Sequence, residues 1–273
     1  MKPLPVKPSS CLLLLALCIA SNGTRAIFKL ARAHAHLRVM TYNIHVGIGM
    51  DKKRDLARTA SVIMDARPDL VALQEVDRGV RRTDLVDEIA ELARLTRMNY
   101  AFAPNLDYQG GKYGVAILSR FPVLSIDHRR YANRREAERR GFIRIEVLVK
   151  GRKINFVTTH LDYQYADGRL FETEQLLKAL GDVKGPTIVA GDFNDEPTGT
   201  SYKLMLSNFS DAWSDATKGT NSGLTYPADK PAKRIDYIFI CKDAGLSATS
   251  AVVPSTLASD HLPLVVDIEF APR

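Results

Sequence analysis

Acidic, histidine and amide residues recur in this sequence directly after short apolar runs or beside them. Carboxylate and amide oxygens are the ligands that hard divalent cations prefer, and histidine exchanges protons near neutral pH. Ligand sites in open α/β sheets lie outside the ends of strands, so polar groups in this position predict one shared site. The residues with this placement are Asn43, Glu75, His160, Asp192, Asn194, Asp236, Asp260 and His261.

Each of these residues taken alone also has a purely structural explanation. Asn or Asp at a strand end is most often a turn former or a helix N-cap. A lone histidine is usually structural, and the Asp236 carboxylate is able to pair with a nearby arginine. A protein without a site has little reason to concentrate groups that are costly to desolvate, so the joint pattern indicates function.

The runs between these residues predict strands alternating with helices from residue 37 onward. Helical periodicity and end signals predict helices at 55–66, 84–98 and 169–180. Apolar runs predict strands at 37–43, 70–76, 114–119, 142–149, 154–160, 187–190, 235–240, 248–253 and 262–270. Strand–helix–strand units mixed with hairpins favour an α/β fold with two mixed sheets packed face to face and helices outside. No proline- or glycine-rich linker interrupts the pattern, so we predict one domain over residues 37–273.

The first 36 residues predict a processing region. Lys2 and Lys7 precede a short apolar stretch at 11–20, and small residues end that stretch, which predicts a signal peptide over 1–20 and a secreted or periplasmic protein. Residues 21–36 are predicted to be a linker or an extended processing segment, with a second small-residue site at 33–35. An uncleaved N-terminal membrane anchor is the alternative, although the apolar stretch is too short to span a bilayer.

Composition and charge limit the class of protein. Hydrophobic residues make up 45% and charged residues 25% of the chain, which excludes disordered and fibrous classes. Removal of Lys2 and Lys7 with the signal peptide lowers the net charge from +7 to +5 and leaves Cys241 as the only cysteine. No internal disulfide is then available, and Cys241 is predicted to be a buried structural thiol. The basic segment 129–140 is either a solvated loop or a positive wall beside an anionic substrate.

Six short blocks resemble the signature blocks of the endonuclease/exonuclease/phosphatase superfamily, which has the deoxyribonuclease I-like fold. They are TYNI at 41–44, LQEV at 73–76, THLD at 159–162, GDFN at 191–194, RIDY at 234–237 and SDHLP at 259–263. The resemblance covers residues 37–270 and is greatest to the compact bacterial secreted metal-dependent hydrolases. It implies a four-layer α/β sandwich that hydrolyses a phosphodiester or phosphomonoester.

In-line attack of water on a phosphoester requires a hard cation, a base for the water and donors for the developing negative charge. Ligand chemistry and the resemblance predict Mg²⁺, which Mn²⁺ can replace, held by Asn43, Glu75 and Asp260. A carboxylate partner fixes the tautomer of a histidine and raises its basicity, and the resemblance makes Asp236 that partner of His261.

The remaining catalytic roles follow from the same resemblance. His261 is a general base or a transition-state clamp, and Asp192 positions or deprotonates the water, so both stay candidates for the base. Asn194 donates to a phosphate oxygen. His160 contacts the phosphate, and its protonated form would assist the leaving group or neutralise the phosphate.

Two further residues are predicted to contact the substrate phosphate. Tyr113 is a candidate hydroxyl donor, with a packed aromatic as the alternative. Arg140 matches the phosphate-side arginine of the superfamily, with Arg139 as its alternative.

The fold does not name the substrate. The basic segment favours a secreted nuclease acting on DNA, whereas export favours a lipid head-group phosphodiesterase of the sphingomyelinase, inositol-phosphatase or glycolipid-anchor kind. A non-catalytic binding protein is the remaining class. The phosphoester substrate is the only predicted partner, and we expect a monomer without a stable protein partner.

Overall fold

The computed structural model describes residues 36–242 and 244–271. The predicted signal peptide and residues 21–35 of the predicted linker lie outside the described residues. The last residue of that linker, His36, begins strand β1 (His36–Asn43), so the domain starts one residue earlier than predicted. No helix within the described ranges is both long enough and apolar enough to cross a membrane.

Two six-stranded sheets form the centre of the domain. The strand order in the first sheet is β11 (Leu246–Val252), β12 (Leu264–Phe270), β1, β2 (Leu70–Arg78), β4 (Gly111–Ser119) and β3 (Asn99–Tyr108). The order in the second sheet is β5 (Val123–Arg130), β6 (Gly141–Val149), β7 (Arg152–His160), β8 (Thr187–Asp192), β10 (Asp236–Cys241) and β9 (Phe209–Asp211). The pairs β1–β2 and β7–β8 are parallel, and the other neighbours are antiparallel.

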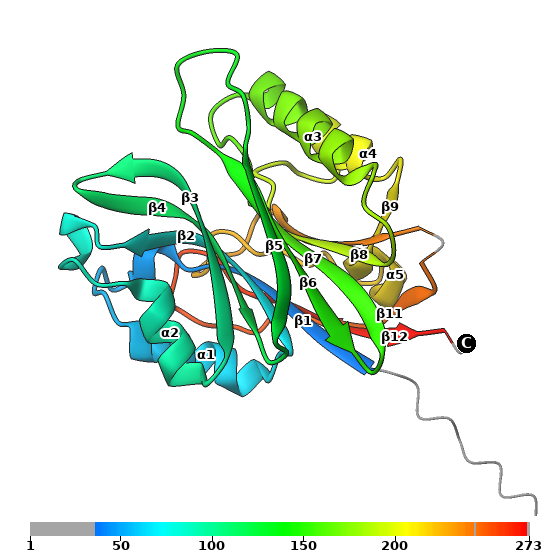
Figure 1. Cartoon of the computed structure of the whole chain (residues 1–273), viewed down its shortest axis with the longest axis horizontal. Helices are drawn as coiled ribbons and strands as arrows, with labels where there is room; N and C mark the ends of the chain where they lie inside the picture. Colours follow the sequence, from blue (N-terminus) through cyan, green and yellow to red (C-terminus); the bar gives the residue numbers. More distant parts are fainter. Residues whose placement is uncertain (1–35, 243, 272–273) are drawn as a thin grey trace, which may run out of the picture. The chain divides into compact units, whose positions relative to one another are not determined.

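Helices cover the outer faces of both sheets. Helices α1 (Leu56–Ala66) and α2 (Glu88–Thr96) lie on the first sheet, whereas α3 (Ala166–Leu180) and α4 (Thr200–Met205) lie on the second (Figure 1). The short helix α5 (Ala212–Thr217) packs beside β11 and places Trp213 in the apolar cluster between the sheets. This arrangement is the predicted four-layer α/β sandwich.

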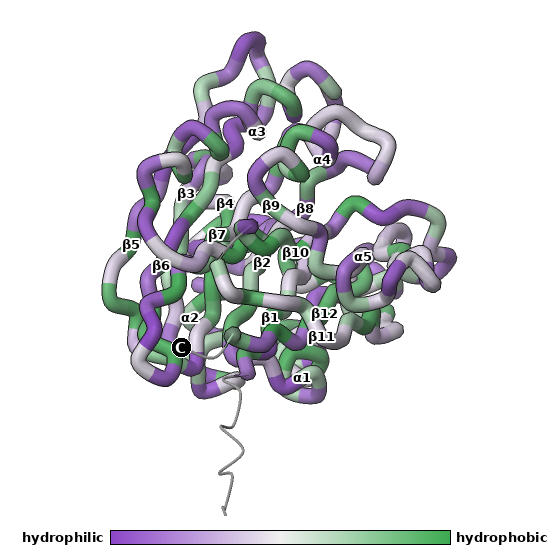
Figure 2. The backbone as a smooth tube through the Cα atoms, turned by 90° about the vertical axis from the view of Figure 1, so that its right-hand side faces the viewer, coloured by the Kyte–Doolittle hydropathy of each residue, from purple (hydrophilic) through white to green (hydrophobic). Residues whose placement is uncertain are grey.

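Alternation along the strands explains the layers. In β1, Val39 belongs to the cluster between the sheets, whereas its neighbour Met40 packs against the helices on the outer face. Both faces of the central strands are therefore buried, which accounts for their nearly continuous apolar sequences. In Figure 2 the central strands carry most of the hydrophobic stretches, and the loop that rises highest beside α3 is mostly hydrophilic.

The two halves of the domain share one connection pattern. The crossover β1–α1–β2 in the first sheet corresponds to β7–α3–β8 in the second, and an antiparallel strand flanks each parallel pair on both sides. The parallel strands therefore end at the edge where their antiparallel neighbours β4, β12, β6 and β10 begin. Residues that lie far apart in the sequence meet at this edge.

The observed elements differ from the predicted ones in a helix boundary and in elements that were not predicted. The helix predicted at 84–98 begins only at Glu88, because Asp84 and Leu85 adopt left-handed backbone and the Asp87 side chain caps the helix by accepting the N–H of Ala90. Leu85 is 65% exposed and so does not share the buried face of α2 with Ile89 and Leu92. Strands β3, β5 and β9 and helices α4 and α5 were not predicted; of these, β5 is a largely exposed edge strand.

Cys241 is only partly buried, at the end of β10. Its sulfur accepts the backbone N–H of Thr187 from the neighbouring strand. Burial raises the pKa of the thiol, although that hydrogen bond opposes the shift. A thiol held neutral in this way is a poor nucleophile, which agrees with a structural role.

A buried carboxylate supports the end of β2. Glu88 has a fully buried side chain, and its Oε2 accepts the N–H of Asp77 at 2.8 Å. Burial raises the pKa of Glu88 from a usual value of 4.5 to about 8, although the hydrogen bond from Asp77 opposes the shift. The folded protein therefore binds this proton more tightly than the unfolded chain does.

We expect Glu88→Gln to reduce the pH dependence of stability. In the wild type the raised pKa of Glu88 makes the free energy of unfolding fall as the pH rises from about 4.5 to about 8. The slope is about 1.4 kcal/mol per pH unit. The variant keeps an acceptor for Asp77 and carries no proton to lose. Urea unfolding at about pH 5 and about pH 8 measures this difference. Glu91→Gln, on the exposed face of the same helix, is the control, and an unchanged slope in Glu88→Gln would contradict the assignment.

Candidate active site

A cleft of about 730 Å³ lies at the edge where the strand ends of both sheets meet. Eight of the ten predicted site residues line it, namely Glu75, Tyr113, Arg140, His160, Asp192, Asn194, Asp260 and His261. The other two, Asn43 and Asp236, are buried and hydrogen-bond to residues of the cleft. The tertiary structure thus brings all ten residues together.

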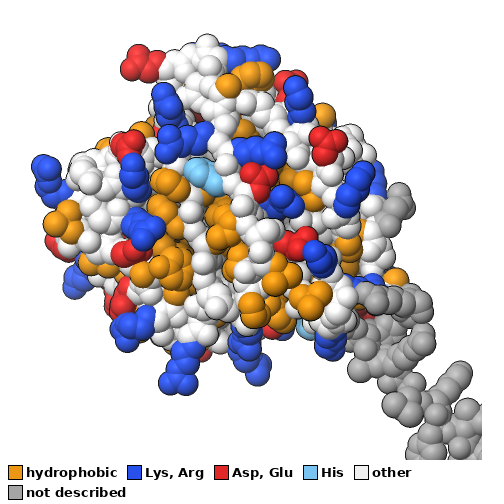
Figure 3. All heavy atoms as spheres, in the orientation of Figure 1, with side chains coloured by type: hydrophobic (Ala, Val, Ile, Leu, Met, Phe, Trp, Pro, Cys, Tyr) orange, Lys and Arg blue, Asp and Glu red, His pale blue; other side chains and the backbone are white. Residues whose placement is uncertain are grey.

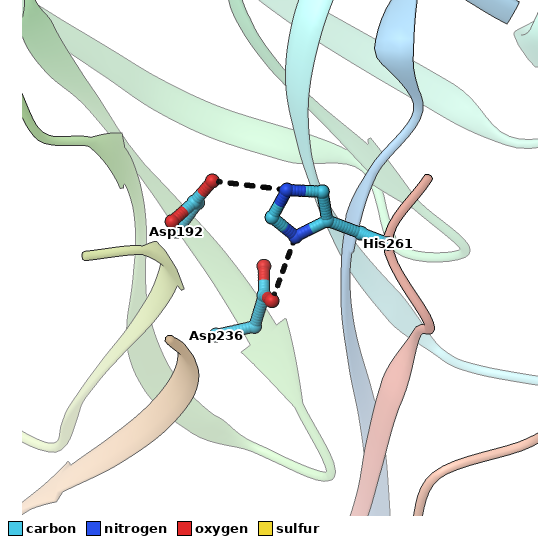
Figure 4. A group of neighbouring side chains, drawn as sticks. All are labelled: Asp192, Asp236 and His261. Atoms are coloured by element: carbon cyan, nitrogen blue, oxygen red, sulfur yellow. Dashed lines mark hydrogen bonds and ion pairs between the residues drawn. The ribbon is translucent and has the colours of Figure 1, made fainter. Parts of the chain in front are cut away.

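His261 lies between two carboxylates (Figure 4). Its Nδ1 is 2.9 Å from Oδ2 of Asp236, the pairing that was predicted, and its Nε2 is 3.7 Å from Oδ2 of Asp192. Burial opposes the protonated form, but the charges of Asp236 and Asp192 outweigh it and raise the pKa of His261 to about 10. The two carboxylates therefore favour an imidazolium that donates from Nδ1 to Asp236 and forms a longer ion pair with Asp192 through Nε2.

The loop before β12 is tied to β1 beneath the cleft. Ser259 donates its hydroxyl to the carbonyl of Asn43 at 2.7 Å, and the N–H of His261 lies 3.2 Å from the same hydroxyl oxygen. The ring of Tyr226 packs against the imidazole of His261, with 4.8 Å between their centroids. These contacts fix the position of the imidazole independently of its carboxylate partners.

Asp192 ends β8 and accepts from both halves of the domain. Its Oδ1 accepts the N–H of Asn194 at 2.9 Å, and its Oδ2 accepts the side-chain amide of Asn43 at 3.1 Å. Burial, followed by the charge of Asp236, raises the pKa of Asp192 to about 7. A carboxylate with this environment takes up a proton more readily than an ordinary aspartate does.

An irregularity in β2 sets the direction of the Glu75 side chain. The register with β4 shifts between Leu73 and Val76, and Glu75 has left-handed backbone with a φ of 58°. A bulge of this kind redirects a side chain at the end of a strand, and strained backbone of this kind is concentrated at functional sites.

Asn43 connects the two carboxylates from opposite sheets. Its Nδ2 donates to Oε1 of Glu75 at 3.0 Å and to Oδ2 of Asp192, while its Oδ1 accepts the N–H of His45 at 3.1 Å. An amide N–H is no ligand for a cation, so the predicted role of Asn43 as an oxygen ligand requires a different amide orientation.

Beneath this group, buried polar side chains join the two sheets. Gln74, next to Glu75, donates its amide to the Thr158 hydroxyl at 2.9 Å and to the Thr41 hydroxyl at 3.2 Å. Thr41 belongs to β1, whereas Thr158 belongs to β7 of the other sheet. This network fixes how far apart the two halves of the site lie.

His160 ends β7 and is neutral. Arg140 Nη1 lies 2.7 Å from His160 Nδ1, and since an arginine only donates, Nδ1 accepts and Nε2 carries the proton. Nε2 faces Oδ2 of Asp192 at 3.4 Å, whereas the Asn194 amide nitrogen, 3.1 Å away, donates to the carbonyl of Leu161. Burial and the charges of Arg140 and His261 hold the pKa of His160 well below its usual range. The contact with Arg140 and the lowered pKa therefore favour the neutral ring over the protonated form that was predicted for His160.

Arg140 and Tyr113 are both packed and accessible from the cleft. Arg140 is 3% exposed, and its Nε is buried without a hydrogen-bond partner, whereas Arg139 is exposed and absent from the cleft lining. The Tyr113 ring packs under Arg82 at 5.2 Å. Burial and the charge of Glu75 raise the pKa of Tyr113 well above its usual value, so its hydroxyl stays a donor.

Asp260 is half-buried, with 29% of its side chain accessible. Its Oδ1 is 3.7 Å from Nδ1 of His45, a nitrogen that is buried without a hydrogen-bond partner. The sequence analysis missed His45, which directly follows the block that contains Asn43. It also missed Glu138, which lines the cleft two residues before Arg140.

Of the two alternatives for the basic segment 129–140, the structure favours a surface loop over a positive wall beside the cleft. Three of its arginines contact acidic or aromatic residues of the chain itself, with Arg129 against Asp127, Arg134 against Glu174 and Phe171, and Arg135 against Asp167 and Tyr165. Of this segment, only Glu138 and Arg140 line the cleft. Figure 3 shows basic side chains spread over the visible face and interspersed with acidic ones.

The residues of the cleft fit a divalent metal. Glu75 and Asp192 each place a carboxylate oxygen about 3 Å from the same Asn43 nitrogen, and Asp260 opens to the same cleft. No arginine, lysine or histidine among the described residues lies within ion-pair distance of Glu75. Oxygen ligands of this kind suit Mg²⁺.

Asp192, Asp236 and His261 also place potential ligand atoms within 4.8 Å of one another. In that group His261 is already held between the two carboxylates, and its raised pKa favours the protonated ring, which has no lone pair for a metal. We therefore interpret this group as an ion-paired cluster and Glu75 as the better metal ligand.

The comparisons with known proteins agree with this geometry. The profile of the family described as "Endonuclease/Exonuclease/phosphatase family" matches residues 40–261. The chain is 30% identical to YbhP of Escherichia coli strain K12 in an alignment of 251 residues that covers 85% of this chain and 95% of YbhP.

Solved structures support the fold. A mannosyl-6-phosphatase of Bacteroides thetaiotaomicron superposes with a TM-score of 0.72 at 18% identity, covering 86% of this chain and 100% of that one. The human Nocturnin catalytic domain with a bound sulfate anion has a TM-score of 0.67 at 24% identity, covering 87% and 95%. Because the family profile spans the first five sequence blocks and the sixth as far as His261, the chain belongs to the endonuclease/exonuclease/phosphatase family.

Proposed function

We propose that this protein is a divalent-metal-dependent phosphoesterase. One observation carries the proposal: the carboxylates of Glu75 and Asp192, from different sheets, converge on Asn43 beside the Asp236–His261 pair in one open cleft. Acidic groups this close to one another repel unless a cation or protons balance them. The arrangement therefore suits a reaction in which a metal and a phosphoryl group enter together.

Each side chain of the site has a separate role in the proposed reaction. Asp192, held by Asn43 and Asn194, accepts the proton of the attacking water. His261, oriented by Asp236, donates to a phosphoryl oxygen as negative charge builds on it. Arg140, the neutral N–H of His160 and the Tyr113 hydroxyl supply further donors to the phosphate. A bound Mg²⁺, held by Glu75 and Asp260, would polarise the phosphoryl group.

The cleft itself favours a compact substrate over DNA. Three arginines of the basic segment pair with acids of the chain itself, which weakens the observation that favoured a nuclease. Among the fold neighbours, one is named a mannosyl-6-phosphatase and another holds sulfate, an analogue of phosphate. Both names are compatible with a site for a single phosphoryl group.

We expect the wild-type protein to release p-nitrophenol from bis-p-nitrophenyl phosphate only with a divalent metal. Excess EDTA should abolish the release, and Mg²⁺ or Mn²⁺ should restore it, because without a cation the carboxylates repel the anionic substrate. Absorbance of p-nitrophenolate measures the rate. Full activity after exhaustive chelation would exclude the metal-dependent mechanism.

We also propose that the protein is exported through residues 1–20 and acts as a monomer. The charged and apolar pattern of that segment supports the export part of the proposal. N-terminal sequencing of the product in the medium or periplasm, and sedimentation of that product, test the two parts separately.

A further inference from the structure

Glu138 is a carboxylate in the wall of the cleft beside the arginine predicted to bind phosphate. Its Oε1 lies 3.2 Å from Arg140 Nη1 and is buried without a hydrogen-bond partner. The side chain as a whole is 31% exposed and lines the cleft together with Tyr113 and His160. The catalytic scheme above leaves this acid without a role.

The loop that carries Glu138 is fastened to α3. The N–H of Ala132 donates to Gln175 Oε1 at 2.8 Å, and the Gln175 amide donates to the carbonyl of Ala132 at 3.2 Å. Arg134 stacks over the Phe171 ring at 4.1 Å, and Arg135 pairs with Asp167. These contacts hold the loop against α3 and keep Glu138 beside Arg140.

Acidic neighbours limit the positive charge that the cleft offers. Three arginines line it, and each faces a carboxylate, with Arg82 against Asp77, Arg140 against Glu138 and Arg169 against Asp195. Lys233 is the remaining cationic residue of the lining apart from its histidines. A chain of phosphates would meet repulsion from these acids on either side of the scissile phosphate.

A carboxylate in this position accepts hydrogen bonds well. Burial raises the pKa of Glu138, although Arg140 opposes the shift, so the ionised form is incompletely stabilised by its surroundings. A hydroxyl or ammonium group of a bound molecule would supply the missing donor.

We propose that Glu138 determines specificity by accepting a hydrogen bond from a hydroxyl or amine on the group esterified to the scissile phosphate, and that it excludes a second phosphate there. The substrate class is then the phosphoester of a polyol, sugar or amino alcohol with a single phosphate. This inference rests on the proposed phosphoesterase function.

Three p-nitrophenyl phosphodiesters that differ only in the second alcohol test the proposal. The alcohols are glycerol, propanol and propanol carrying a terminal phosphate. We expect the wild type with Mg²⁺ to favour the glyceryl over the propyl ester by about 10- to 100-fold in kcat/KM, the loss typical of one hydrogen bond to a charged group. Glu138→Ala should abolish this preference, and Glu138→Gln should raise the rate on the phosphorylated ester relative to the propyl ester.

Glu136→Gln is the matched control, because Glu136 is an exposed acid on the same loop. It should leave all three rates unchanged. If Glu138→Ala changes the glyceryl and propyl rates by the same factor, Glu138 only positions Arg140 and the inference is wrong. If the wild type hydrolyses none of the esters, the proposed function fails instead.

Discussion

Glu75→Gln is expected to remove nearly all metal-dependent hydrolysis while the protein stays folded. The substitution takes a negative charge from the end of β2 and leaves an oxygen that still accepts from Asn43, so a bound metal would lose the most. Changing a residue that only supports a metal ligand typically costs about 10- to 100-fold in activity. We expect a larger loss here, because Glu75 is proposed to be a ligand itself. Assays of p-nitrophenyl ester hydrolysis across Mg²⁺ concentrations measure the effect.

The same variant should bind Mg²⁺ more weakly in calorimetry, which separates a ligand from a structural residue. Its thermal midpoint without metal should not decrease, because removing the charge relieves repulsion with Asp192. Glu174→Gln is the control, as its side chain is 51% exposed on α3. Wild-type Mg²⁺ affinity in Glu75→Gln would show that the metal binds elsewhere.

His261→Asn is expected to lower kcat/KM by about 10²- to 10⁴-fold, the range for a positioned proton donor or acceptor. Asp236→Asn should cost nearly as much, because the amide cannot stabilise the imidazolium that lies 2.9 Å away. Residues that act as one unit are not additive. The double variant should therefore be no slower than His261→Asn alone.

Single-turnover kinetics of the wild type and the three variants complete this cycle. Circular dichroism checks the fold, and His128→Asn on the edge strand β5 controls for loss of a histidine. Multiplicative losses in the double variant would mean that Asp236 and His261 act independently, against the contact that the structure shows.

The sequence by itself determined the architecture and the membership of the site. Apolar runs long enough for strands, separated by amphipathic helices, dictate a sandwich because each sheet must bury both faces. The polar residues after those runs were identifiable because ligand sites of α/β folds form at the ends of strands. The pairing of Asp236 with His261 came from the family resemblance and is observed.

The tertiary structure alone decided what those residues do to one another. The bulge that aims Glu75, the inward turn of the Asn43 amide and the neutral state of His160 all depend on contacts between sheets or with buried neighbours. The arginines of the segment 129–140 look like a binding surface in the sequence, yet Arg134 and Arg135 contact α3 and Arg129 pairs with Asp127 within β5. Side-chain orientation, desolvation and local charge depend on distances across the fold, and no local pattern of residues encodes those distances.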